Sequence, residues 1–72
     1  MFEQLRELRR EIATSRGVPA YVVFSDATLL EMAETIPTSP QALLDISGVG
    51  PRKLERYGER FLSLLRQLAQ GA

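Results

Sequence analysis

The residues best suited to binding lie in and directly after a short glycine turn. Gly48 and Gly50 flank a valine that we expect to pack under the turn, and Pro51 suits the first position of a following helix. Arg52 and Lys53 fall in the first turn of that helix, beside N–H groups that have no partner inside it. Such a helix start is suited to binding a phosphate. The alternative is that the glycines only let two helices pack at a sharp angle.

A tyrosine and an arginine earlier in the chain are further candidates for binding. Tyr21 follows Arg16 closely in the sequence. An aromatic face beside a cation suits single-stranded nucleic acid, because a base stacks on the ring and a phosphate meets the charge. Arg56, shortly after the glycine turn, adds another cation to this set. The alternative is a half-buried tyrosine that belongs to the core.

The composition gives little support for catalysis. The 72 residues include no histidine and no cysteine, so the commonest general base, the commonest metal ligand and any thiolate are absent. Carboxylates occur, but we expect them on helix surfaces without a partner base. We therefore predict no catalytic residue, no metal and no cofactor for this chain.

The net charge of zero conceals a segregation of charge along the chain. Residues 1–20 carry four bases and three acids, residues 21–50 carry four acids and no base, and residues 51–72 carry five bases and two acids. We expect a dipolar molecule whose two ends build a basic side. The acidic set, which offers an alternative surface for docking a basic protein, is Asp26, Glu31, Glu34 and Asp45.

Apolar periodicity predicts a first helix from Phe2 to Arg16, and Gly17 should end it. The stretch from Val18 to Ser25 has no helical period, so we predict a buried connector with a turn of 3₁₀-helix. One of its two aromatic residues, Tyr21 or Phe24, should pack inward.

Three more helices are predicted after the connector. Asp26 is a good N-cap for the first of them, with Ser25 as its rival. Ser39 should cap a short helix that starts at Pro40, and Gly58 should kink or divide the long last helix. The expected apolar face of the first of these helices is Leu29, Leu30, Met32, Ala33 and Ile36.

These elements predict an all-α fold, a compact bundle of four to five short helices with a glycine-containing turn of the helix-hairpin-helix kind. We expect residues 1–72 to form a single small domain taken from a larger protein. No apolar run reaches the length of about 20 residues that spans a bilayer, and the chain lacks cysteine. We therefore expect a cytoplasmic monomer with no membrane partner.

Several motifs, in order along nearly the whole chain, resemble one family. They are VPAYVVFSDATL at residues 18–29, Met32-Ala33, Ile36-Pro37, ISGVG at residues 46–50 and KLERYG at residues 53–58. Together they are similar to the HRDC domain, which occurs at the C-termini of RecQ-family DNA helicases and of RNase D. The likeness is strongest to bacterial RecQ helicases. This resemblance implies a five-helix bundle that binds nucleic acid or protein, while ATP hydrolysis takes place elsewhere in the parent protein.

The resemblance also implies roles for particular residues. In DNA-binding members, the connector tyrosine and nearby basic residues contact single-stranded DNA, which implies such a role for Tyr21 and Arg16 here. It extends to the glycine turn with Arg52 and Lys53. DNA-binding members tend to be basic, however, whereas this chain is neutral.

Two functions are therefore open from the sequence. The chain is either an auxiliary domain of a RecQ-type ATP-dependent DNA helicase that weakly binds single-stranded or partly single-stranded DNA, or a module that docks through its acidic set on other domains of the helicase or on a partner. The first would tune substrate selection in DNA repair and recombination, at the bacterial nucleoid. An RNA-processing role in an RNase D-like parent is a third, lesser option.

Overall fold

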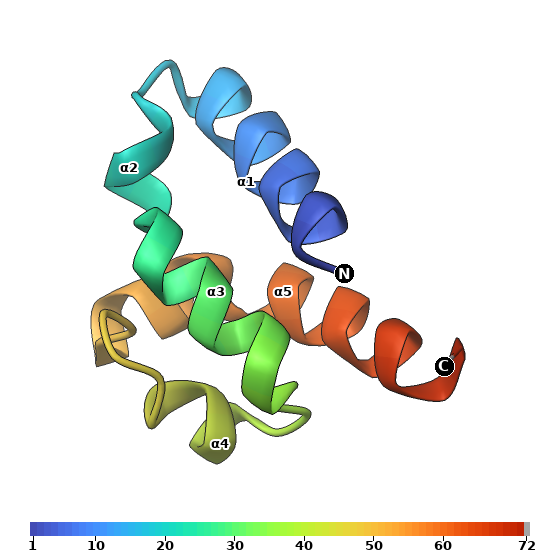
Figure 1. Ribbon diagram of the computed structural model, residues 1–72. Helices are drawn as coiled ribbons and strands as arrows, with labels where there is room; N and C mark the ends of the chain where they lie inside the picture. The colour runs from blue at the N-terminus through green and yellow to red at the C-terminus, as the bar shows by residue number, and fades with distance from the viewer. Residues whose placement is uncertain (72) are drawn as a thin grey trace.

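The computed structural model describes residues 1–71 and contains five helices (Figure 1). They are α1 (Phe2–Arg16), α2 (Ala20–Val23), α3 (Asp26–Thr35), α4 (Pro40–Leu44) and α5 (Pro51–Gly71). All regular secondary structure in this range is helical. α5 runs behind α3 in the view of Figure 1 and packs against both α1 and α4. The predicted all-α bundle is confirmed.

The first helix ends as its sequence predicts. Gly17 adopts a left-handed conformation (φ 69°), and its N–H bonds to the carbonyl groups of Ala13 and Thr14. A residue with a Cβ would be strained there, so the glycine fixes where α1 stops. On the inner face of the helix, Leu5 and Ile12 are buried.

The connector contains one turn of α-helix, α2, where we expected a 3₁₀ turn. Its two aromatic residues face opposite ways: Phe24 is fully buried, whereas the side chain of Tyr21 is exposed. Phe24 meets the rings of Tyr57 and Phe61 edge-on, with centroids 5.8 and 5.0 Å away. Such aromatic contacts add to the burial of apolar area, so Phe24 anchors the connector to α5.

The N-cap of α3 is Ser25, so the prediction of Asp26 for this role is wrong. The Thr28 N–H donates to the Ser25 hydroxyl (3.3 Å), while the Asp26 carboxylate turns back to α1. The apolar face of α3 is also narrower than predicted. Leu29 is buried, but Leu30 is half exposed and lies outside the core.

The cap of α4 is confirmed, because the Ser39 hydroxyl accepts the Ala42 N–H (3.1 Å) and Pro40 opens the helix. The glycine turn that follows is more extended than a simple helix end, since α4 stops at Leu44, four residues before Gly48. Gly48 does have a positive φ of 91°.

The glycine turn is fastened to α3. The hydroxyl of Thr28 donates to the carbonyl of Ser47 (2.9 Å), and a Cβ placed on Gly48 would lie only 2.3 Å from that hydroxyl oxygen. Val49 is buried beneath the turn, as predicted. The turn therefore requires glycine at position 48 both for its backbone conformation and for its close approach to Thr28.

Gly58 was predicted to kink or divide the last helix. The helix is continuous from Pro51 to Gly71, so the predicted division is wrong. Gly58 is buried, and a Cβ there would lie 2.6 Å from Leu54 and 3.8 Å from Leu43. This glycine therefore leaves room for the Leu54 side chain of the preceding turn, while Leu43 of α4 lies at an ordinary contact distance. Phe61 and Leu65 continue the buried face of α5 into the core.

Candidate nucleic-acid interface

Tyr21 is the most exposed large apolar side chain of the protein. It lies on the single turn of α2, and 72% of its surface is accessible. Val22 beside it is also exposed, whereas Val23 and Phe24 are buried and hold the turn in place. An exposed ring on an anchored turn is available to stack on a base, because burial does not occupy its face.

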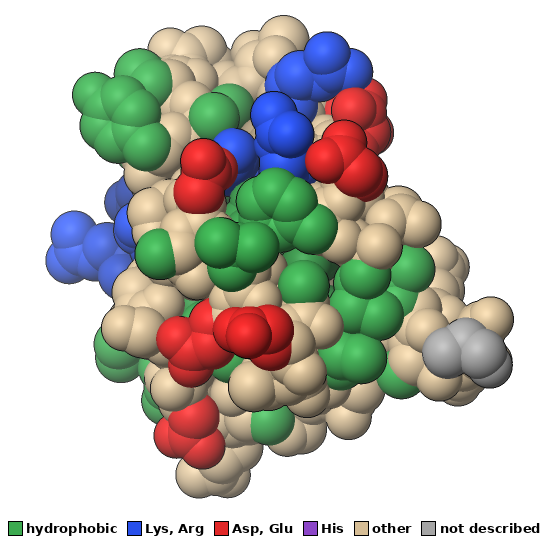
Figure 2. Space-filling model, in the orientation of Figure 1, with side chains coloured by type: hydrophobic (Ala, Val, Ile, Leu, Met, Phe, Trp, Pro, Cys, Tyr) green, Lys and Arg blue, Asp and Glu red, His purple; other side chains and the backbone are tan. Residues whose placement is uncertain are grey.

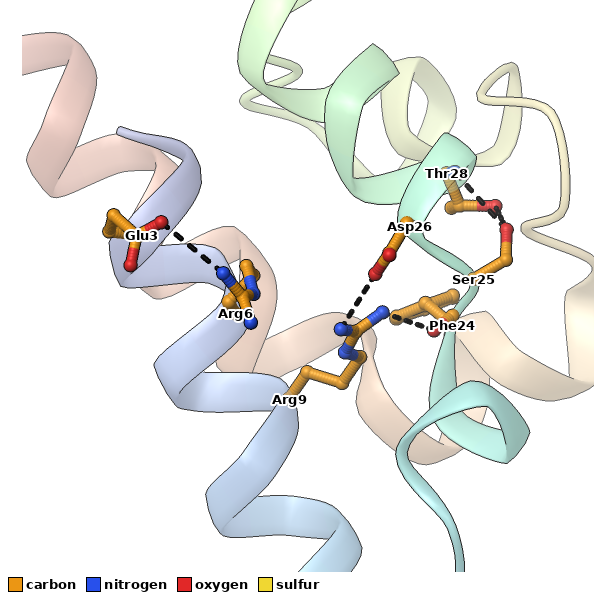
Figure 3. Close-up of polar contacts among 7 residues, drawn as sticks. All are labelled: Glu3, Arg6, Arg9, Phe24, Ser25, Asp26 and Thr28. Atoms are coloured by element: carbon orange, nitrogen blue, oxygen red, sulfur yellow. Dashed lines mark hydrogen bonds and ion pairs between the residues drawn. The ribbon is translucent and has the colours of Figure 1, made fainter.

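A buried arginine fixes the segment that joins α2 to α3 (Figure 3). Arg9 of α1 donates from Nη1 to the carbonyl of Phe24 (2.9 Å) and from Nη2 to the carboxylate of Asp26 (2.8 Å). Its side chain is nine-tenths buried, and its Nε has no hydrogen-bond partner among the described residues. Arg9 therefore serves the fold, and its charge is not available to a phosphate.

The other charges of α1 are mostly paired. Arg6 pairs with Glu3, and Arg10 pairs with Glu7. The hydrogen bond from Arg10 to the Glu7 side chain, followed by the attraction between the two charges, raises the pKa of Arg10 above its ordinary value. On α1, Arg16 is the one arginine with no carboxylate within ion-pair distance among residues 1–71.

Two of the predicted cations lie over buried aromatic rings. The Arg16 guanidinium lies 5.2 Å from the centre of the Tyr57 ring, and the Lys53 ammonium lies 5.7 Å from the centre of the Phe24 ring. Such contacts hold a cation in place while leaving it charged. Because Phe24 and Tyr57 touch each other, the end of α1 and the start of α5 come together around this aromatic pair.

Five cations make no ion pair in the described part of the chain, and four of them were predicted for binding. These are Arg16, Arg52, Lys53, Arg56 and Arg66. Arg66 donates instead to the carbonyl of Thr38 (2.8 Å). We call the remaining four the basic strip, which comprises Arg16, Arg52, Lys53 and Arg56. Figure 2 shows basic side chains at the left edge of the molecule, near the start of α5.

The glycine turn places Arg52 and Lys53 at the start of α5. The Leu54 N–H donates to the carbonyl of Gly50 (2.9 Å), which makes Gly50 the residue before the helix. Leu54 therefore donates the first hydrogen bond of the helical pattern, and the N–H groups of Arg52 and Lys53 before it have no acceptor within the helix. Gly50 has no positive φ and has open space for a Cβ, so only Gly48 is conformationally required.

The acidic set lies on α3 and on the turn directly after α4, and Figure 2 shows acidic side chains gathered over α3 and α4. Its members differ in availability. Asp26 is paired with Arg9, and Glu31 accepts the Ser47 N–H (3.3 Å). Glu34 and Asp45 are exposed and make no ion pair within residues 1–71. Half of the predicted acidic set is therefore already in use inside the domain.

Arg9 is the structural residue beside the candidate site that the sequence analysis missed. Its position relative to Leu5 and Ile12, four residues after one and three before the other, places it on the inner face of α1. A charged residue at an apolar position of a helix predicts a buried partner, and that signal was present in the sequence.

Two other kinds of site find no support in the described residues. No helix among residues 1–71 is long and apolar enough to cross a membrane. Nor do the described side chains bring together three acidic residues in a group that could hold a metal ion.

Comparison with known proteins places this geometry in a family. The family model described as "HRDC domain" matches residues 1–65. The chain is 49% identical over 67 residues to "ATP-dependent DNA helicase RecQ" of Haemophilus influenzae, which covers 93% of this chain and 11% of that protein. It is 47% identical over 70 residues to RecQ of Bacillus subtilis, covering 97% of this chain and 12% of the relative.

The similarity extends to a second helicase name and to a solved structure. The chain is 51% identical over 63 residues to "ATP-dependent DNA helicase UvrD2" of Mycobacterium tuberculosis, covering 88% of this chain and 9% of that protein. The structure titled "D. radiodurans RecQ HRDC domain 3" superposes with a TM-score of 0.89 at 40% identity, over 94% of this chain and 90% of that one. The chain thus spans about a tenth of the length of these helicases. It belongs to the HRDC domain family.

Proposed function

We propose that this HRDC domain is an accessory module of an ATP-dependent DNA helicase of the RecQ type and binds single-stranded DNA weakly. A base stacks on Tyr21, and the basic strip meets phosphates. In the parent protein, the domain tunes the choice of substrate in DNA repair and recombination, while other domains hydrolyse ATP. The names of the RecQ relatives support a parent of the RecQ type. The UvrD2 relative supports only the broader assignment to an ATP-dependent DNA helicase.

The observation that carries the proposal is the exposure of Tyr21. A tyrosine that is 72% accessible, on a turn anchored from both sides, gains nothing for the fold from its ring. Stacking of one base contributes about 1–3 kcal/mol, which is enough to matter in a weak complex. The cations of the basic strip, which have no carboxylate partner within residues 1–71, supply the electrostatic part of the binding.

Replacing the tyrosine tests the proposal. Tyr21→Ala is expected to weaken binding of a fluorescent single-stranded oligonucleotide by roughly five- to a hundredfold in an anisotropy titration at low salt, because one stacking contact is lost. The melting temperature should not change, since the ring is exposed. Val22→Ala, the exposed neighbour on the same turn, is the matched control and should bind as the wild type does. Equal affinities for all three proteins would refute a stacking role for Tyr21.

The unpaired members of the acidic set favour a second function, which is docking on a protein. Glu34 and Asp45 are exposed and unpaired within residues 1–71. The exposed Leu30 lies on α3 with Glu34, and the exposed Leu44 ends α4 directly before Asp45. Charged groups beside apolar side chains suit a partner surface with basic and apolar residues. Under this alternative, the domain docks on another domain of the helicase and contacts DNA little.

The two functions are separable by experiment. A substitution of Glu34 and Asp45 to glutamine and asparagine removes the unpaired negative charges without touching the basic strip. DNA binding by the isolated chain should be preserved or slightly strengthened, while docking on the parent helicase core, measured by calorimetry, should be lost. Docking that survives this double substitution would contradict the second function.

A further inference from the structure

A small pocket lies between the end of α1 and the middle of α5. Its volume is about 170 Å³, and its lining is Ile12, Ser15, Arg16, Arg56, Tyr57 and Arg60. Three of these six side chains are arginines contributed by two different helices. The volume is well below the range of about 300–1,000 Å³ that is typical of pockets for larger ligands, so the pocket suits one small group.

The three arginines are differently engaged. Arg16 is held over the Tyr57 ring at 5.2 Å, and Arg56 makes no ion pair within the described residues. Arg60 meets Glu11 of α1, but only at 3.5 Å, and the two side chains are 57% and 58% exposed. A long, exposed ion pair of this kind contributes little, so Arg60 is able to change partner at small cost.

The chemistry of this lining points to a phosphate. A guanidinium group donates two parallel hydrogen bonds to phosphate oxygens, which makes arginine the preferred side chain for this anion. Ser15, which also lines the pocket, carries a hydroxyl that can act as a neutral donor. The lining itself contains no carboxylate, although Glu11 pairs with Arg60, which is one of the lining residues.

The pocket also continues the basic strip. Arg52, Arg56 and Arg60 follow one another at steps of four residues and therefore lie along one side of α5, at a rise of about 6 Å per step. A strand that runs along this side would meet these arginines in turn. Arg60 thus extends the basic strip along α5, although its pairing with Glu11 leaves it outside the set of unpaired cations.

We propose that this pocket binds one backbone phosphate of a single-stranded nucleic acid, and that Arg60 exchanges Glu11 for that phosphate on binding. The proposal rests on the proposed function and deepens it, because it assigns one phosphate of the bound strand to a defined site. Glu11 then acts as an internal competitor that limits affinity. Its removal should strengthen binding, whereas removal of Arg60 should weaken it.

Four variants of the full 72-residue chain test this exchange by anisotropy with a single-stranded oligonucleotide. Arg60→Gln is expected to weaken binding roughly two- to fivefold and to lower the salt slope by about 0.7. Glu11→Gln should strengthen binding by a similar factor in the wild type, but not in the Arg60→Gln background. Arg10→Gln, which removes an arginine outside the pocket, is the matched control and should leave the affinity near that of the wild type.

Two outcomes would overturn the exchange. The first is that Arg60→Gln and Glu11→Gln behave like Arg10→Gln. The second is that Glu11→Gln strengthens binding equally in both backgrounds, because its effect would then be a general one of charge. If Tyr21→Ala weakens binding while these variants do not, the proposed function stands and the phosphate pocket falls. If the wild type binds no oligonucleotide even at low salt, the proposed function itself falls.

Titration with inorganic phosphate distinguishes a site for free phosphate from a site for a backbone phosphate of a nucleic acid. In NMR spectra at constant ionic strength, phosphate in place of chloride should shift the guanidinium signals of Arg16, Arg56 and Arg60, and leave those of Arg6 and Arg10 in place. Absence of these shifts would contradict the pocket. Shifts with inorganic phosphate, together with an oligonucleotide affinity that is unchanged by Arg60→Gln, would assign the pocket to free phosphate and overturn its role in nucleic-acid binding.

Discussion

At the scale of single residues, Arg9 is the charged side chain of α1 that is buried in the fold. Its guanidinium satisfies the carbonyl of Phe24 and the carboxylate of Asp26, and so removes one cation and one anion from the surface. The cost of burying a charge is offset because both ends of the fork are paired. The consequence is a rigid junction between α2 and α3, directly beside the turn that exposes Tyr21.

Replacing Arg9 tests this structural role. Arg9→Met keeps much of the apolar stem but leaves the carbonyl of Phe24 without its donor, which should lower the free energy of unfolding by about 1–3 kcal/mol. Asp26 adds little to this cost, because its side chain is 72% exposed and stays hydrated. Urea denaturation measures the change. Arg6→Met, on the exposed side of α1, is the control and should fall within about 0.5 kcal/mol of the wild type.

An unchanged stability for Arg9→Met would show that the junction does not depend on this arginine.

The sequence indicated that either Tyr21 or Phe24 packs inward, but it did not indicate which of the two does so. The choice follows from the space between Tyr57 and Phe61, which only Phe24 reaches. Which of the two aromatic residues is buried therefore depends on residues more than thirty positions away, and the local sequence pattern does not contain this information.

The bounds of the helices were predictable where strong local signals mark them. Gly17, Ser39 with Pro40, and Pro51 each act through a backbone conformation or a cap that needs no distant partner. A division of the last helix at Gly58 was predicted wrongly, because a glycine within a helix gives the same sequence signal whether it ends the helix or makes room for a side chain. The close approach of the Leu54 side chain indicates the second role.

The glycine turn supplies the prediction at the scale of elements. Gly48→Ala should destabilise the domain by about 1–2 kcal/mol or more, because φ is +91° and the new Cβ would meet the Thr28 hydroxyl at 2.3 Å. Gly50→Ala is the matched control, since its φ is not positive and nothing lies within 4 Å of its Cβ. Equal denaturation midpoints for the two variants would remove the conformational requirement at position 48.

The distribution of charge belongs to the whole molecule, and the sequence showed only part of it. Segregation along the chain was visible from counts alone, and Figure 2 shows acidic side chains gathered over α3 and α4, in the middle of the chain. Pairing between distant helices was not visible, because Glu11 and Arg60 lie far apart in the sequence and meet only in the fold. Pairing leaves the basic strip as the cationic surface, and its small size predicts weak binding.

Removing one cation of the basic strip tests this electrostatic account. Arg52→Ala should lower the steepness of the salt dependence by about 0.7, the contribution of one phosphate contact on a single strand. The fold should be unaffected, because the side chain is exposed. Arg6→Ala, which removes a cation already paired with Glu3, serves as the control and should leave the slope unchanged. A slope unaltered by Arg52→Ala would exclude this residue from phosphate contact.

The affinity of the wild-type chain for a single-stranded oligonucleotide, measured by fluorescence anisotropy at low salt and at about 0.15 M salt, tests the central claim most directly. Two or three phosphate contacts from the basic strip predict a slope of log K against log[salt] of about −2. Binding should therefore be detectable at low salt, with a dissociation constant in the micromolar range or above, and fade at the higher concentration. No detectable binding at low salt would contradict the claim that this domain binds single-stranded DNA.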